Sequence, residues 1–172
     1  WARAPSLAEF DEWQAASANL VRLVTLSPHW PEAPSFIAAL HARGVRVAIG
    51  HTHADSAQIA AAVEAGASLS THLGNGAHAM LPRHPNYLWS QLAQDPLSAS
   101  FIADGHHLPA ETLRAMIRAK GLERSILVSD AVALAGMPPG DYETPVGGRV
   151  TLSADGRLSV ANTVFLAGAA RP

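Results

Sequence analysis

Four polar residues with the chemistry of an active site stand just after short apolar runs of the chain. VRVAIG is followed by His51, ASLST by His72 and ILVS by Asp130, while His107 closes the stretch ADGHH after SASFI. Their separations are 21, 35 and 23 residues, each about one strand–helix unit. Imidazole and carboxylate groups suit zinc and similar divalent metals as ligands. The spacing therefore predicts a metal site assembled from successive units of the fold.

The same residue types suit a hydrolytic reaction. A catalytic metal keeps an open position for water and lowers the pKa of that water to about 7. A carboxylate beside it can take the proton of the water and pass it to a leaving amine, which is the role we expect of Asp130. His107 could polarise the scissile carbonyl or hold the substrate, and both roles stay open. A single histidine after a strand is weak evidence for a site. Three histidines and an aspartate at the same place in successive strand–helix units are hard to explain by chance.

The elements that must position these residues alternate between helices and strands. Some segments have apolar residues at helical spacing, and short continuous apolar runs separate them. Ser6 and Asp55 are expected N-caps of the first and third helical segments. Gly44, Gly66 and Gly121 come directly after the second, third and fourth segments. We expect helices at 6–19, 32–43, 55–65 and 109–120, and strands at 21–28, 45–50, 67–73, 97–104 and 125–131.

This order predicts an α/β fold with a parallel sheet and right-handed crossovers. Either an open doubly wound sheet or a barrel fits the order. In both, the carboxyl ends of the strands lie on one face, so we expect His51, His72, His107 and Asp130 to converge there. The connection at 74–90 is long and contains Gly, Pro and His, which is typical of a functional loop.

After Ala131 the chain becomes rich in turn residues. Two antiparallel strands are expected at 148–153 and 157–161, around Ala154-Asp155-Gly156. We interpret residues 146–161 as a β-hairpin insertion within one barrel domain that covers residues 1–172.

Five motifs, in this order and spacing, resemble the N-acetylglucosamine-6-phosphate deacetylases of the amidohydrolase superfamily. They are VTLSP (24–28), GHT (50–52), THLGN (71–75), ADGHH (103–107) and VSDA (128–131), and the resemblance runs from about residue 21 to the end. It implies a (β/α)8 TIM-type barrel, of which this chain would form roughly the second half. It also implies a hydrolase of linear amides that removes an acetyl group from an N-acetylated amino sugar, above all N-acetylglucosamine 6-phosphate.

The resemblance assigns roles to several residues of the chain. It implies a divalent metal, zinc first, with iron, manganese or cobalt as alternatives. By resemblance, His51 and His72 are metal ligands, Asp130 is the catalytic aspartate, His107 contacts the substrate, and Asn75 with Gly76 belongs to the sugar-phosphate region.

Two positions depart from the family pattern. The VTLSP segment is normally followed directly by a metal-binding Glu, and here His29 stands in that place. We take His29 as the third metal ligand, although it brings no negative charge. The loop after Asn75 reads GAHAMLPRHPN instead of the usual Asn-Ala-Met turn. Within it, Arg83 is a candidate clamp for a phosphate or carboxylate, because Arg binds such groups bidentately.

Composition narrows the range of partners. The 172 residues are 48% hydrophobic and 15% charged, with a net charge of −2, so no basic stripe for nucleic acid and no disordered tail is expected. There is no cysteine, which excludes disulfides and thiolate zinc sites. No apolar run has the length of a membrane span. We expect a cytoplasmic protein with a small amino-sugar substrate, and the resemblance implies a homodimer for the full-length protein.

The chain lacks an initiator Met and stops just after an apolar stretch, so we expect both ends to be cuts in a longer chain. Two other functions remain open. One is a related amidohydrolase with another N-acyl substrate, suggested by the loop at 74–86. The other is a catalytically silent metal-binding fragment, suggested by His29 in place of Glu.

Overall fold

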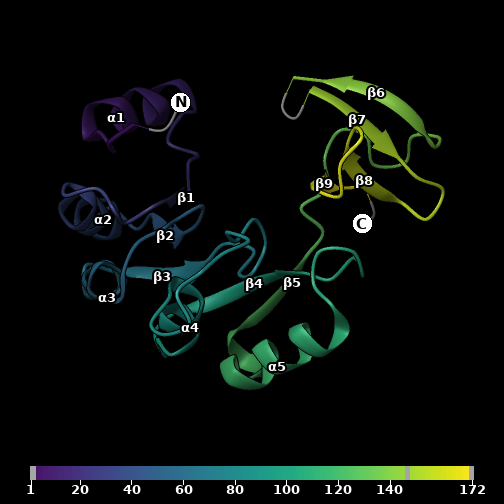
Figure 1. The fold of residues 1–172 in the computed structure, drawn as a ribbon. Coiled ribbons are helices and arrows are strands. Elements are labelled where there is room, and N and C mark those ends of the chain that lie inside the picture. The colour runs from purple at the N-terminus through teal and green to yellow at the C-terminus, as the bar shows by residue number, and fades with distance from the viewer. Residues whose placement is uncertain (1–2, 146–147, 171–172) are drawn as a thin grey trace.

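The computed structural model describes residues 3–145 and 148–170, which form nine strands and six helices (Figure 1). Five strands and all the helices belong to the first part of the chain, and four strands belong to the last part. The helices are α1 (Leu7–Ala16), α2 (Ala33–Ala42), α3 (Ser56–Glu64), α4 (Tyr87–Leu92), α5 (Ala110–Lys120) and the 3-10 helix η1 (Leu122–Arg124). The strands are β1 (Leu23–Leu26), β2 (Arg46–Ile49), β3 (Ala67–Ser70), β4 (Ser98–Ile102), β5 (Ser125–Val128), β6 (Gly140–Thr144), β7 (Gly148–Leu152), β8 (Arg157–Val160) and β9 (Leu166–Ala169).

The order of the first five strands decides between the two architectures left open by the sequence. Strands β1 to β5 are all parallel, and each pairs with the next strand along the chain. A doubly wound sheet reverses its strand order at a switch point, and these five strands show no reversal. The sheet curves as an arc, with α2, α3, α4 and α5 on its outer side (Figure 1). The five strands are therefore part of the wall of a (β/α) barrel, as expected.

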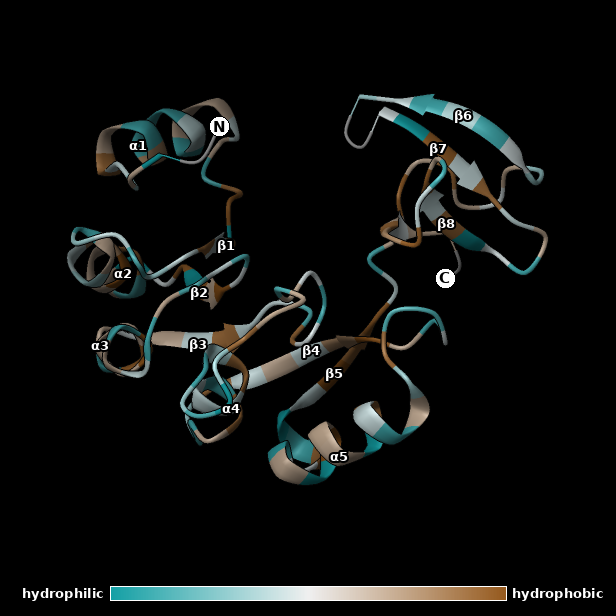
Figure 2. Ribbon diagram, in the orientation of Figure 1, coloured by the Kyte–Doolittle hydropathy of each residue, from teal (hydrophilic) through white to brown (hydrophobic). Residues whose placement is uncertain are grey.

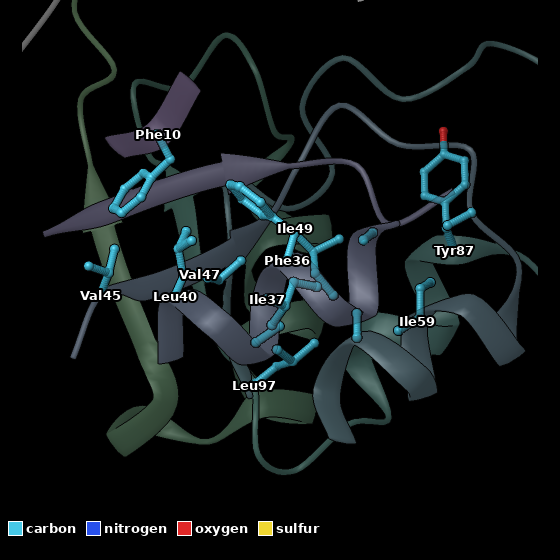
Figure 3. Close-up of a cluster of buried hydrophobic side chains, with 14 residues drawn as sticks. Phe10, Phe36, Ile37, Leu40, Val45, Val47, Ile49, Ile59, Tyr87 and Leu97 are labelled. Carbon is cyan, nitrogen blue, oxygen red and sulfur yellow. The ribbon is translucent and has the colours of Figure 1, made fainter. Parts of the chain in front are cut away.

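The main core lies between the sheet and the helices that cover it. Phe36, Ile37 and Leu40 of α2 are all buried, and they pack with strand residues such as Val47 in one apolar cluster (Figure 3). Their spacing of one, three and four residues places them on one face of the helix. This packing holds α2 on the sheet and so fixes where the chain enters β2 and His51.

Leu40→Ala is expected to lower the free energy of unfolding by about 2–5 kcal/mol, because it leaves a cavity where a fully buried leucine stood. Leu122→Ala removes the same atoms from a side chain that is 80% exposed, and its effect should stay within about 0.5 kcal/mol. Urea titrations followed by circular dichroism measure both changes. Equal midpoints for the two variants would contradict this view of the core.

The hairpin expected at 146–161 is the central pair of a larger sheet. Strands β7 and β8 pair antiparallel as expected, but β6 and β9 flank them in a four-stranded sheet of order β6-β7-β8-β9. The expected pair of antiparallel strands is therefore present, and the structure adds one strand on each side of it; residues 146 and 147 lie outside the described residues. Most residues of β6 (GDYET) are hydrophilic, as Figure 2 shows. The segment therefore lacked the apolar run by which other strands were predicted.

Part of the long connection at 74–90 is helical. Helix α4 begins after Asn86, whose Oδ1 accepts hydrogen bonds from the backbone N–H groups of Leu88 (3.1 Å) and Trp89 (3.3 Å). Asn is a favoured N-cap, so Asn86 was the available signal for this helix. Within the described ranges, no helix combines the length and the apolar character that a bilayer span requires.

Candidate metal and substrate site at the strand ends

Three of the residues singled out by the sequence occupy equivalent backbone positions. His51, His72 and Asp130 are each the second residue after their strand, namely β2, β3 and β5. All three have positive φ, at 47°, 31° and 51°, a region that residues other than Gly seldom adopt. Only three other non-Gly residues of the described chain share this feature. Strain of this kind concentrates at functional sites, which marks this edge of the sheet as a candidate site.

His51 and His72 point their ring nitrogens at each other. The two Nε2 atoms are 3.1 Å apart, and the rings meet edge to face at 84°. The backbone N–H of His72 donates to Ser100 Oγ on β4 (2.8 Å), and Ser100 Oγ in turn donates to the carbonyl of Ser70 (3.3 Å). These bonds hold the chain of β3 against β4 at the point where it turns into the site.

The electrostatics of His72 connect the other candidate residues to this pair. His72 is buried, and burial lowers the pKa of its ring below the usual value. The nearby rings of His51 and His107 lower this pKa further, whereas the Asp130 carboxylate opposes them. His72 is therefore a neutral imidazole at neutral pH, which is the form that binds a metal. Asp130 and His107 are close enough for their charges to act on it.

The pair fits two ligands of one metal ion. Two zinc–nitrogen bonds of about 2.0–2.1 Å at a tetrahedral angle would separate the nitrogens by about 3.3 Å, close to the 3.1 Å observed. Nδ1 of His72 is buried and has no hydrogen-bond partner. Across residues 3–145 and 148–170, no group of three His, Asp or Glu residues is arranged to hold a metal ion, so a third ligand is not in place.

His29, expected as that third ligand, lies against other partners. Its Nδ1 contacts Ser27 Oγ at 2.5 Å, and its ring lies 4.3 Å from the His53 ring and 4.6 Å from the Trp30 ring. Burial, followed by the charge of His53, lowers the pKa of His29. His29 is the third residue after β1, one position later than His51 and His72 after their strands. It does line a cavity of about 330 Å³ together with His51, so its role as a ligand stays a prediction.

His107 is held by an aspartate that the sequence analysis did not assign to the site. Its Nδ1 lies 2.7 Å from Asp104 Oδ2, and the side chains of both residues are at most 3% exposed. Burial raises the pKa of Asp104, but the backbone N–H groups of His107 and His106 and the His107 ring together bring it below its usual value. Asp104 is the second residue after β4, in phase with His51, His72 and Asp130. That phase was the signal that could have found it.

The loop residues expected to contact the substrate divide into two groups. Asn75 and Gly76 line a small cavity together with His51 and His72, and the backbone N–H of Asn75 donates to the carbonyl of His72 (2.9 Å). Arg83 is exposed and is not among the residues that line this cavity. Tyr87 anchors the loop that connects Gly76 to Arg83, because the Tyr87 hydroxyl accepts a hydrogen bond from the backbone N–H of His78 (2.9 Å).

The fold and the site together define a class of protein. The chain forms part of a (β/α) barrel in which histidines and aspartates gather at the carboxyl ends of the strands, where barrel enzymes have their active sites. No family model matches the chain.

Comparison with known proteins narrows this class. The chain is 34% identical over 164 residues to N-acetylglucosamine-6-phosphate deacetylase of Bacillus subtilis, covering 92% of the chain and 41% of the relative. It is 36% identical over 159 residues to N-acetylgalactosamine-6-phosphate deacetylase of Escherichia coli O157:H7, covering 89% and 42%. The structure of N-acetyl-D-glucosamine-6-phosphate deacetylase from Mycobacterium smegmatis matches with a TM-score of 0.88 at 32% identity, over 98% of the chain and 44% of that protein.

The chain is thus a homologue of part of the N-acetylglucosamine-6-phosphate deacetylases, and the resemblance found in the sequence is confirmed. The chain spans about 40% of the length of the curated relatives that it matches.

Proposed function

We propose that the protein hydrolyses the N-acetyl group of an amino sugar 6-phosphate, with N-acetylglucosamine 6-phosphate as the first substrate to test. The observation that carries this proposal is the His51–His72 pair, with the Asp130 carboxylate acting on His72 from the end of β5. Homology to deacetylases of this type supports the choice of reaction. The homodimer and the cytoplasmic location implied by the sequence stay predictions.

His51 and His72 would hold a divalent metal, and His29 would join them by turning away from His53. When bound, the metal supplies Lewis acidity to a water molecule and to the acyl carbonyl. Asp130 accepts a proton from the attacking water and delivers it to the sugar nitrogen as the amide C–N bond breaks. The products are acetate and the free amine of the sugar. His107 binds the substrate beside the reacting carbon, and Asn75 and Gly76 shape the wall of the same cavity.

The direct test is turnover of N-acetylglucosamine 6-phosphate by the metal-loaded protein, measured as acetate released. N-acetylgalactosamine 6-phosphate is assayed beside it, because relatives named for that substrate also match this chain, at 36% and 37% identity. N-acyl amino acids are the third group, because the loop at 74–86 departs from the family pattern and so favours a different N-acyl substrate as the second candidate. Turnover of N-acyl amino acids with no turnover of either sugar phosphate would replace the proposal with that candidate.

Arg83 is expected to bind the phosphate of the substrate. Arg83→Ala should raise KM for the sugar phosphate by about 10–100-fold with little change in kcat, because a charge-assisted hydrogen bond of about 1.5–3 kcal/mol is lost in the ground and transition states alike. Unphosphorylated N-acetylglucosamine should show no such change. Arg114→Ala, on the exposed face of α5, is the matched control. An unchanged KM for the phosphorylated sugar would remove Arg83 from the site.

A further inference from the structure

We propose that Asp104 is a positioning residue that keeps a proton on Nδ1 of His107, so that Nε2 is the ring atom presented to the substrate. The placement of the proton follows from the contacts and the ionised state of Asp104, and it does not depend on the proposed function. The statement that Nε2 meets the substrate rests on the proposed function.

The contact allows one arrangement of the proton. An ionised carboxylate can only accept hydrogen bonds, and the low pKa of Asp104 keeps it ionised at neutral pH. A distance of 2.7 Å between Asp104 Oδ2 and His107 Nδ1 then requires a donor on the ring nitrogen. The two side chains are 3% and 2% exposed, so water does not replace this bond.

The second oxygen of Asp104 prevents the carboxylate from turning. Oδ1 accepts from the backbone N–H groups of both His106 and His107, each at 2.9 Å. These two donors hold the carboxylate in the turn that follows β4, and the carboxylate in turn holds the ring. The neighbouring His106 ring faces elsewhere, since its Nε2 contacts the carbonyl oxygen of Asp155 at 3.2 Å.

This arrangement explains why an aspartate stands in phase with His51, His72 and Asp130 without being one of the proposed ligands. A histidine with a free ring could present either nitrogen, or could change tautomer during binding. Fixing the proton on Nδ1 directs Nε2 outward in a single hydrogen-bonding state, as outer partners of functional histidines commonly do. His107 also lies close enough to His72 to be one of the groups that lower the pKa of that ring.

Asp104→Asn should invert the arrangement with almost no change in shape. The amide oxygen must stay where Oδ1 accepts from the two backbone N–H groups, so the amide NH2 takes the place of Oδ2. It then donates to His107 Nδ1, which loses its proton, and the neutral ring carries its proton on Nε2. In serine proteases, the same isosteric Asp→Asn change beside the catalytic histidine produces the wrong tautomer and lowers kcat by about 10⁴-fold.

The experiment is long-range ¹H–¹⁵N NMR of protein labelled with ¹⁵N-histidine, in which the two ring nitrogens have distinct shifts when only one is protonated. His107→Gln identifies the signals by their loss. We expect Nδ1 of His107 to be protonated in the unaltered protein, and Nε2 alone to be protonated in Asp104→Asn. Asp155→Asn is the matched control and should leave the His107 pattern unchanged. An unprotonated Nδ1 in the unaltered protein, assigned through His107→Gln, overturns the proposal even if Asp104→Asn does not fold.

Kinetics test the part that concerns the substrate. Asp104→Asn should lower kcat/KM for the sugar phosphate by about 10–100-fold with unchanged metal content. The expected NMR inversion with unchanged kcat/KM would overturn the role of Nε2 toward the substrate. The expected NMR result in a protein that turns over none of the tested substrates supports the proton placement and counts against the proposed function instead.

Discussion

Asp130→Asn is expected to lower kcat for deacetylation by about 10²–10⁴-fold while the bound metal is retained. This range is typical for removal of a general acid–base group. An amide cannot take the proton of the attacking water at neutral pH and has no proton to return to the leaving nitrogen. The metal stays because Asp130 acts on His72 through its charge and is not one of the paired nitrogen ligands.

The substitution is well matched to the backbone. Asp130 has a φ of 51°, and Asn adopts this left-handed conformation more easily than most residues. The Asp130 side chain is exposed, so little packing changes. A loss of activity can therefore be assigned to the missing carboxylate.

Turnover and metal content are measured on the same preparation. Asp95→Asn is the control, because the Asp95 side chain is 85% exposed and its ion pair with Arg124 at 3.4 Å is a weak surface contact. If Asp130→Asn keeps kcat within about threefold of the unaltered protein, Asp130 is not the proton carrier, since a general base is worth far more.

His72→Asn is expected to remove the metal from the protein. A lost ligand should weaken metal binding by more than the roughly 10–100-fold that is typical when only an outer partner of a ligand is changed. His72 is 7% exposed, and its Nε2 is one of the two nitrogens of the proposed site. Asn is chosen because it tolerates the φ of 31° at this position and has no imidazole.

Metal content after dialysis, measured by elemental analysis, checks this expectation, and circular dichroism checks that the fold is kept. His41→Asn makes the same chemical change on an exposed position of α2 and should leave the metal content unchanged. A folded His72→Asn protein that still carries one metal per chain would place the metal elsewhere.

Much of the fold could be predicted because its signals are local. Ser6 and Asp55 cap α1 and α3 as expected, and Asp55 forms a full capping box with Gln58. The apolar run VAI correctly marked β2, whose residues Val47, Ala48 and Ile49 are all buried. Such signals need only a few neighbouring residues, so they are visible in one sequence.

Other elements depend on partners that are distant along the chain. β6 is a hydrophilic segment that becomes a strand because it pairs with β7, and β9 pairs with β8 and also contacts Ala131 through a parallel bridge. The choice between a barrel and a doubly wound sheet likewise depended on which strands are neighbours. Local patterns do not contain this pairing information.

By itself, the sequence determined the alternation of helices and strands, and the residues that follow each strand by two positions. The tertiary structure decided which of these residues meet: it turned His51 and His72 toward one another, placed the His29 ring against His53, and joined Asp104 to His107. The reason is geometric. The end of a strand fixes where the backbone of the following residue lies. The direction of its side chain depends on backbone angles, such as the positive φ of His51, and on partners from neighbouring strands.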